Sequence, residues 1–224
     1  MSEPNGASEQ KPDGSGQKAD ISRRTMVGYL AAVPFALAFE GEPETLLRAA
    51  ERAKGALAAR AAGAPPFVPE FFTEAEFTTV RVLADLVIPR DDRSGSATDA
   101  AVPEYMDFVL TDTTGSRDSM RNGLAWLDAE SLTRFGAAFA DASPGDQTLL
   151  LDDIAWPDRA PEAVADGVRF FNLFRDMTGA GFFSSKMGVE DLQYMGNTFI
   201  LNWEGCPDEA CEKLGVSYEE QWEG

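Results

Sequence analysis

Apolar residues recur along most of this chain at the three- and four-residue spacing of an amphipathic helix, and no run alternates strictly as a strand would. The clearest helix begins after Thr73, which forms a capping box with Glu76, and it ends before Pro89. One face of that helix carries Phe77, Val80, Leu83, Ala84 and Val87. A helix with one apolar face packs against a core, so this segment predicts part of an all-α protein.

The same spacing predicts further helices, joined by loops. They cover residues 44–62, about 103–110, and the stretches that open at Ser116, Ser143 and Pro161. Residues 44–62 form either the first helix of the mature protein or a semi-ordered spacer. Residues 64–72 form a proline-punctuated linker whose aromatic side chains could dock on the body, and residues 90–101 form an acidic loop. We therefore expect an irregular helical bundle of five to six helices with a loop-rich C-terminal segment.

The pattern changes after Met177, where glycine and aromatic residues become frequent. We interpret Gly179-Ala180-Gly181 as a tight turn that ends a helix, because no strand precedes it as a phosphate-binding turn requires. Aromatic residues on an irregular tail are typical anchors at protein interfaces. The candidate partner contacts are Phe182, Phe183, Tyr194, Trp203, Tyr218 and Trp222. The alternative is that the tail packs over its own bundle.

The N-terminal segment has the features of a bacterial twin-arginine export signal. Arg23 and Arg24 follow a polar leader and precede the apolar run 27–38, whose 12 residues are too few to span a bilayer. Ala36 and Ala38 form an A-x-A cleavage site. The alternative is an ordinary N-terminal helix with two surface arginines. We expect a signal peptide over 1–38, a helix and linker over 39–69, and a helical domain with an aromatic tail over 70–224. The expected partner in export is the twin-arginine translocase and the destination is the periplasm.

Composition removes several classes of function. The chain has no histidine, which excludes Ser-His-Asp and Cys-His nucleophile systems, histidine-ligated haem and zinc sites that use histidine. The net charge of −19 disfavours nucleic-acid binding, because an acidic surface repels phosphate backbones. Carboxylates alone could still perform acid–base chemistry. Because the chain lacks histidine, catalysis by it is nevertheless disfavoured, and we expect no catalytic, cofactor-binding or metal-binding residues in it.

Cys206 and Cys211 are the two cysteines of the chain. In an oxidising periplasm we expect a disulfide between them, since a loop bounded by Gly205 and Pro207 would bring their Cα atoms close enough. Free thiols, or a bridge to a partner, are the alternatives.

Other polar groups give weaker signals. Asp91-Asp92 and Asp152-Asp153 could be paired catalytic carboxylates, but adjacent residues on a helix point to different faces, so solvated positions are the better interpretation. The side chains of Gln193, Asn197 and Asn202 could bind a sugar, or they could satisfy loop backbone.

Five segments in order resemble the gluconate 2-dehydrogenase subunit 3 family. They are residues 71–77 (FFTEAEF) with 83–89 (LADLVIP), 101–107 (AVPEYMD), 123–128 (GLAWLD), and 181–185 (GFFSS) with Gly188, Leu192, Tyr194 and Gly196. The resemblance covers residues 70–205. The chain departs from the family in Phe182-Phe183, where tyrosine is common, and in its acidic tail.

This resemblance implies an accessory role. In the dehydrogenase complexes to which members of this family belong, the FAD and the catalytic residues belong to a large subunit of the glucose-methanol-choline (GMC) oxidoreductase class, which oxidises sugars or polyols. A cytochrome c subunit often takes the electrons. The small subunit holds no cofactor, supports the folding of the large one and lends it an export signal. A stand-alone secreted carbohydrate-binding module, or an enzyme that uses carboxylates, is the alternative.

Overall fold

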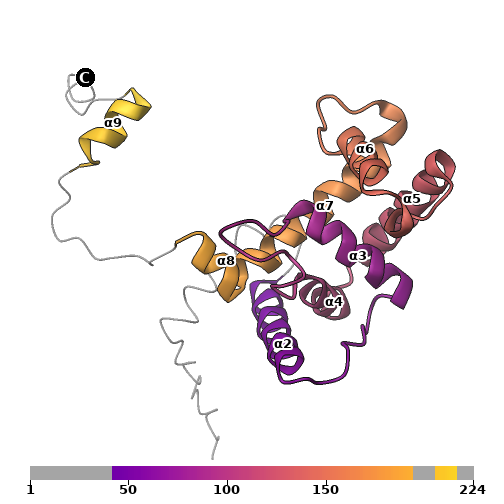
Figure 1. Cartoon of the computed structure of the whole chain (residues 1–224), viewed down its shortest axis with the longest axis horizontal. Helices are drawn as coiled ribbons and strands as arrows, with labels where there is room; N and C mark the ends of the chain where they lie inside the picture. Colours follow the sequence, from indigo (N-terminus) through magenta and orange to yellow (C-terminus); the bar gives the residue numbers. More distant parts are fainter. Residues whose placement is uncertain (1–41, 194–204, 216–224) are drawn as a thin grey trace, which may run out of the picture. The chain divides into compact units, whose positions relative to one another are not determined.

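The computed structural model describes residues 42–193 and 205–215, and the helices and contacts below refer to these residues. Its order is α2 (Pro43–Ala61), α3 (Glu74–Val87), α4 (Val102–Asp112), α5 (Arg117–Phe135), α6 (Pro144–Ile154), α7 (Ala165–Ser184) and α8 (Lys186–Asp191). Short 3-10 turns lie at Phe139–Asp141 and Glu162–Val164. Helix α9 (Asp208–Leu214) belongs to a separate unit and is described by itself. The described residues contain no strand, which confirms the all-α prediction (Figure 1).

The helices form where their capping and proline signals indicate. Thr73 and Glu76 make both hydrogen bonds of the capping box at α3. Ser143 caps α6 by accepting a hydrogen bond from the backbone N–H of Asp146. Eight α-helices appear in the described residues, more than the five to six expected, because α8 and α9 lie within the segment predicted to be loop-rich.

Helix α4 is the centre of the larger unit. Every residue from Val102 to Leu110 is buried, and α2, α3 and α7 all contact this helix. Helix α2 places Leu46, Ala49 and Ala53 in the core, so residues 43–61 form a packed helix and not a semi-ordered spacer. At the C-terminal end of α4, the Nε of Arg117 donates to the carbonyl oxygen of Leu110 at 2.6 Å.

The linker between α2 and α3 is fixed by Asp107 of α4. The Asp107 side chain is fully buried, and its carboxylate accepts hydrogen bonds from the backbone N–H groups of Glu70 (2.8 Å), Phe71 (2.9 Å) and Phe72 (3.0 Å). Phe67 packs against Phe108 of α4, with ring centroids 5.4 Å apart. The aromatic residues of the linker therefore dock on the body, as predicted.

Helices α5 and α7 cross through two reciprocal contacts between a glycine and an aromatic ring. A Cβ atom on Gly123 of α5 would lie 1.9 Å from Cδ2 of Phe170, and one on Gly167 of α7 would lie 2.2 Å from Cη2 of Trp126. Each helix supplies one glycine and one ring. The rings occupy the space that side chains at the glycines would fill, so the two backbones approach closely.

The prediction that Gly179-Ala180-Gly181 ends a helix is wrong. Helix α7 continues through these residues to Ser184. A Cβ atom on Gly181 would lie 2.7 Å from Cδ1 of Tyr105, so the glycine is there to admit the Tyr105 ring of α4. Gly181 serves a close helix–helix contact and not a turn.

We predict that Asp107→Ala lowers the free energy of unfolding by about 3 kcal/mol, because it leaves three backbone donors at the edge of the core without an acceptor. Urea denaturation of the purified protein measures this loss. Asp112→Ala on the same helix is the control: Asp112 makes only a long, partly exposed ion pair with Arg52 (3.9 Å), so its removal should cost less than about 1 kcal/mol. Equal losses in the two variants would contradict the role given to Asp107.

We predict that Gly123→Ala destabilises the protein by about 2 kcal/mol, because the new methyl group would overlap the Phe170 ring. Gly55→Ala in α2 is the matched control, since nothing lies within 4 Å of its added Cβ. That control should raise stability by up to about 1 kcal/mol, as alanine is the better helix former. A thermal unfolding series that ranks the two variants in the opposite order would refute the close crossing of α5 and α7.

Candidate functional site: the groove between α5 and α7

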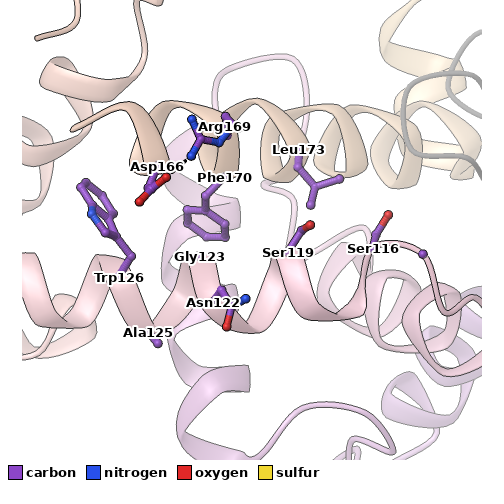
Figure 2. Close-up of a pocket in the computed structure, with 11 residues that line it drawn as sticks. Ser116, Ser119, Asn122, Gly123, Ala125, Trp126, Asp166, Arg169, Phe170 and Leu173 are labelled. Carbon is purple, nitrogen blue, oxygen red and sulfur yellow. Dashed lines mark hydrogen bonds and ion pairs between the residues drawn. The ribbon is translucent and has the colours of Figure 1, made fainter. Parts of the chain in front are cut away.

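An open groove of about 830 Å³ lies between α5 and α7. From α5 and the turn before it come Gly115, Ser116, Ser119, Asn122, Gly123, Ala125 and Trp126, and from α7 come Asp166, Arg169, Phe170 and Leu173. Figure 2 shows Trp126 at one end beside Asp166, Phe170 reaching from α7 toward Gly123, and Leu173 facing Ser119 further along. Both walls come from helices that pack together through the contacts at Gly123 and Gly167.

The walls of the groove carry polar groups that are open to ligands. Ser119 and Asn122 are exposed, and the structure gives neither side chain a hydrogen bond with another described residue. Asp166 and Arg169 form an exposed ion pair one turn apart on α7. They are the only charged residues in the lining, so its formal charge is zero.

The floor of the groove is apolar. Phe170 is buried, while Trp126 and Leu173 are partly exposed and pack against the core cluster. A surface of this kind can hold an apolar face of a ligand while the walls bind its polar groups. No site predicted from the sequence lies in this groove, because its residues gather only when α5 and α7 lie side by side.

Three other carboxyl groups in the described residues make contacts that serve the fold. The backbone N–H of Ser96 donates to Asp99 and holds the pKa of that carboxyl below its usual range. Burial raises the pKa of Glu104, although Arg60 lies 3.7 Å from its carboxylate. Asp85 accepts hydrogen bonds from the N–H and the hydroxyl of Thr98, at 2.8 and 2.6 Å, which fixes the loop before α4.

The adjacent carboxylates considered from the sequence are solvated, as expected. Asp91, Asp92, Asp152 and Asp153 are all exposed. Asp91 accepts the backbone N–H groups of Arg93 and Ser94, each at 2.8 Å, and the hydrogen bonds lower its pKa. Asp153 pairs with Arg134 at 2.6 Å. Across the ranges 42–193 and 205–215, no three acidic or cysteine residues gather as a metal site would need.

The candidate partner contacts divide into three groups. Phe182 is only 1% exposed and lies in the core, so its side chain is not available to a partner, because α7 extends further than predicted and carries it inward. Phe183 is partly buried and packs edge-on against Phe182, with ring centroids 5.3 Å apart. Tyr194, Trp203, Tyr218 and Trp222 lie outside the described residues.

The export residues Arg23, Arg24, Ala36 and Ala38 also lie outside the described residues. Gln193 has a positive φ of 54°, and Asn197 and Asn202 are not described. None of the described helices is both long and apolar enough to cross a bilayer.

The two cysteines lie in the second unit. Gly205 has a φ of 97° and Pro207 precedes α9, so Cys206 lies at a bend before this helix and Cys211 lies within it. The Sγ of Cys211 approaches the carbonyl oxygen of Cys206 at 3.9 Å. The disulfide between them remains a prediction.

Comparison with known proteins identifies the family of this chain. No curated protein and no solved structure matches the chain. The family model described as gluconate 2-dehydrogenase subunit 3 matches residues 74–205, a range that includes helices α3 to α8 and therefore both walls of the groove. The match covers more than half of the chain and confirms the resemblance found in the sequence. The chain belongs to the gluconate 2-dehydrogenase subunit 3 family.

Proposed function

We propose that this chain is the non-catalytic accessory subunit of a periplasmic FAD-dependent dehydrogenase of the GMC type that oxidises a sugar or polyol. Membership of the family makes the chain a subunit of a multi-subunit dehydrogenase. The finer role, which is to support the folding of the catalytic subunit and its export by the twin-arginine route, is our inference. In this proposal FAD belongs to the catalytic subunit, and a cytochrome c subunit is a candidate electron acceptor.

The family match is the observation that carries the proposal, and two further features support it. Many charged side chains in the described residues make structural contacts: Asp107 holds the linker, Arg117 caps α4, and the Nη2 of Arg121 donates to the carbonyl oxygen of Phe71 at 2.6 Å. The leader with Arg23-Arg24 and the Ala36-Leu37-Ala38 site supplies the address.

A twin-arginine signal is an address that a receptor reads, and it is not a membrane anchor. In our proposal the large subunit takes up FAD and folds against this subunit before the pair crosses the membrane. The aromatic residues Phe183, Tyr194, Trp203, Tyr218 and Trp222 are the candidate contacts with the large subunit, since tyrosine and tryptophan often anchor interfaces.

We predict that replacing both Arg23 and Arg24 with lysine leaves this chain and its catalytic subunit in the cytoplasm when the two are co-expressed. Fractionation followed by immunoblotting and a dye-reduction assay of each fraction measures the distribution. Arg48→Lys is the matched control, because Arg48 is an exposed arginine of α2 that only pairs with Glu44 at 3.5 Å. That variant should be exported normally.

A catalytic subunit that reaches the periplasm without the twin arginines would refute the escort role. Turnover of a sugar by the purified chain alone would refute the non-catalytic role and favour a stand-alone enzyme.

A further inference from the structure

We propose that the groove between α5 and α7 is a binding site for a neutral polyhydroxy ligand, a sugar or polyol, held by Trp126, Asn122, Asp166 and Arg169. The inference stands on the lining of the groove and does not require the proposed export role.

The first argument is that the groove exists before any ligand arrives. Gly123 and Gly167 each accommodate the aromatic ring of the opposite helix, so the separation of α5 and α7 is set by these two ring contacts. Met120, Leu124 and Leu127 of α5, and Phe174 and Met177 of α7, are buried behind the groove. A preformed site avoids the ordering cost that a mobile one would incur on binding.

The second argument is the match between the wall groups and hydroxyl groups. A sugar hydroxyl both donates and accepts hydrogen bonds. The Asp166 carboxylate accepts, the Arg169 guanidinium donates, and the amides and hydroxyls of Asn122 and Ser119 do both. Hydrogen bonds to the two charged groups are the stronger ones. Because Ser119 and Asn122 have no hydrogen-bond partner among the described residues, a ligand displaces only water from them.

The third argument is the indole of Trp126. Its ring lies at one end of the groove beside Asp166, and it is partly exposed although one edge packs over Gly167 (Figure 2). The face of an aromatic ring carries the negative part of its quadrupole and attracts groups with partial positive charge. The C–H groups on one face of a sugar ring have that character. Trp126 can therefore stack on the apolar face of a sugar while Asp166 binds its edge.

The fourth argument concerns charge and disfavours an anionic ligand. The lining has one acidic and one basic residue, already paired with each other. An anion would meet the field of a chain with net charge −19. A neutral ligand does not meet this penalty.

The fifth argument separates a sugar from a protein segment. Both walls are helices whose backbone groups bond within the helix, so the groove offers no free edge for pairing with an extended peptide. An amphipathic helix needs a continuous apolar stripe, but Ser119 and Asn122 interrupt the α5 wall. The polar groups come from side chains, at the scale of a small ligand.

The test is an NMR titration of the full chain with D-glucose, with D-sorbitol and with D-gluconate, following the indole N–H signals of the four tryptophans. Because the groove is open, we expect dissociation constants of about 1–10 mM for the neutral ligands. The Trp126 signal should shift, the Trp156 signal should not, and gluconate should bind at least several-fold more weakly than glucose.

Two variants make the test specific. Asn122→Ala removes an exposed side chain without a structural contact, so it should leave the melting temperature unchanged and weaken glucose binding at least fivefold. Trp156→Phe is the matched control, since Trp156 is 58% exposed outside the groove, and it should bind glucose as the unaltered chain does.

The proposal is overturned if no signal moves at about 100 mM glucose or sorbitol, the range in which a millimolar site saturates. It is also overturned if Asn122→Ala binds as tightly as the unaltered chain, or if gluconate binds as tightly as glucose. Shifts in the groove caused by the catalytic subunit but not by sugars would identify a protein interface instead. Loss of sugar binding with intact co-export would leave the accessory role standing, so the two proposals fail separately.

Discussion

The buried carboxylate of Asp107 is the contact on which the rest of the larger unit depends. It is fully enclosed, and three consecutive backbone N–H groups of the linker supply the hydrogen bonds that its charge requires. By holding residues 70–72 against α4, it fixes where α3 begins and places Phe67 and Phe72 over the core. Arg121 strengthens the same junction, since it bonds the carbonyl oxygen of Phe71 and pairs with Glu76 at 3.1 Å. One carboxylate of α4 thus holds the linker between α2 and α3 against the central helix.

Glycine positions have the corresponding role where α7 packs against α5 and α4. Gly123, Gly167 and Gly181 each lie where an aromatic ring from another helix fills the space of a side chain. The rings therefore set the helix separations, and α7 is the helix on which all these contacts converge. The groove between α5 and α7 follows from this geometry. Its floor is formed where the helices touch, and its walls are formed by side chains that the crossing leaves facing solvent.

Local signals made much of the fold predictable. The capping box at Thr73, the prolines at the starts of α4 and α6 and the spacing in α3 gave the helices nearly their true bounds. The errors arose where glycine has two uses. The sequence cannot distinguish a glycine that ends a helix from one that admits a neighbouring ring, so α7 was predicted to stop before Gly181. Phe171 and Phe174, followed by Phe182 eleven residues after Phe171, lie on one helical face that continues past that point, and this was the signal that could have corrected it. The groove was not predictable, since Trp126 and Asp166 meet only through the packing of α5 on α7.

The burial of α4 has a consequence for where this protein can be divided. The family match begins at residue 74, yet α2 and the linker before that residue cover α4 and supply Arg52, whose guanidinium lies 3.9 Å from the centre of the Phe108 ring. The part of the chain that folds together is therefore longer than the part that matches the family model. A fragment that begins at residue 74 would expose Glu104, Asp107 and Phe108 together. Two carboxylates and an apolar surface that are buried in the intact chain would then face water. Any recombinant boundary for this family member belongs ahead of Pro43.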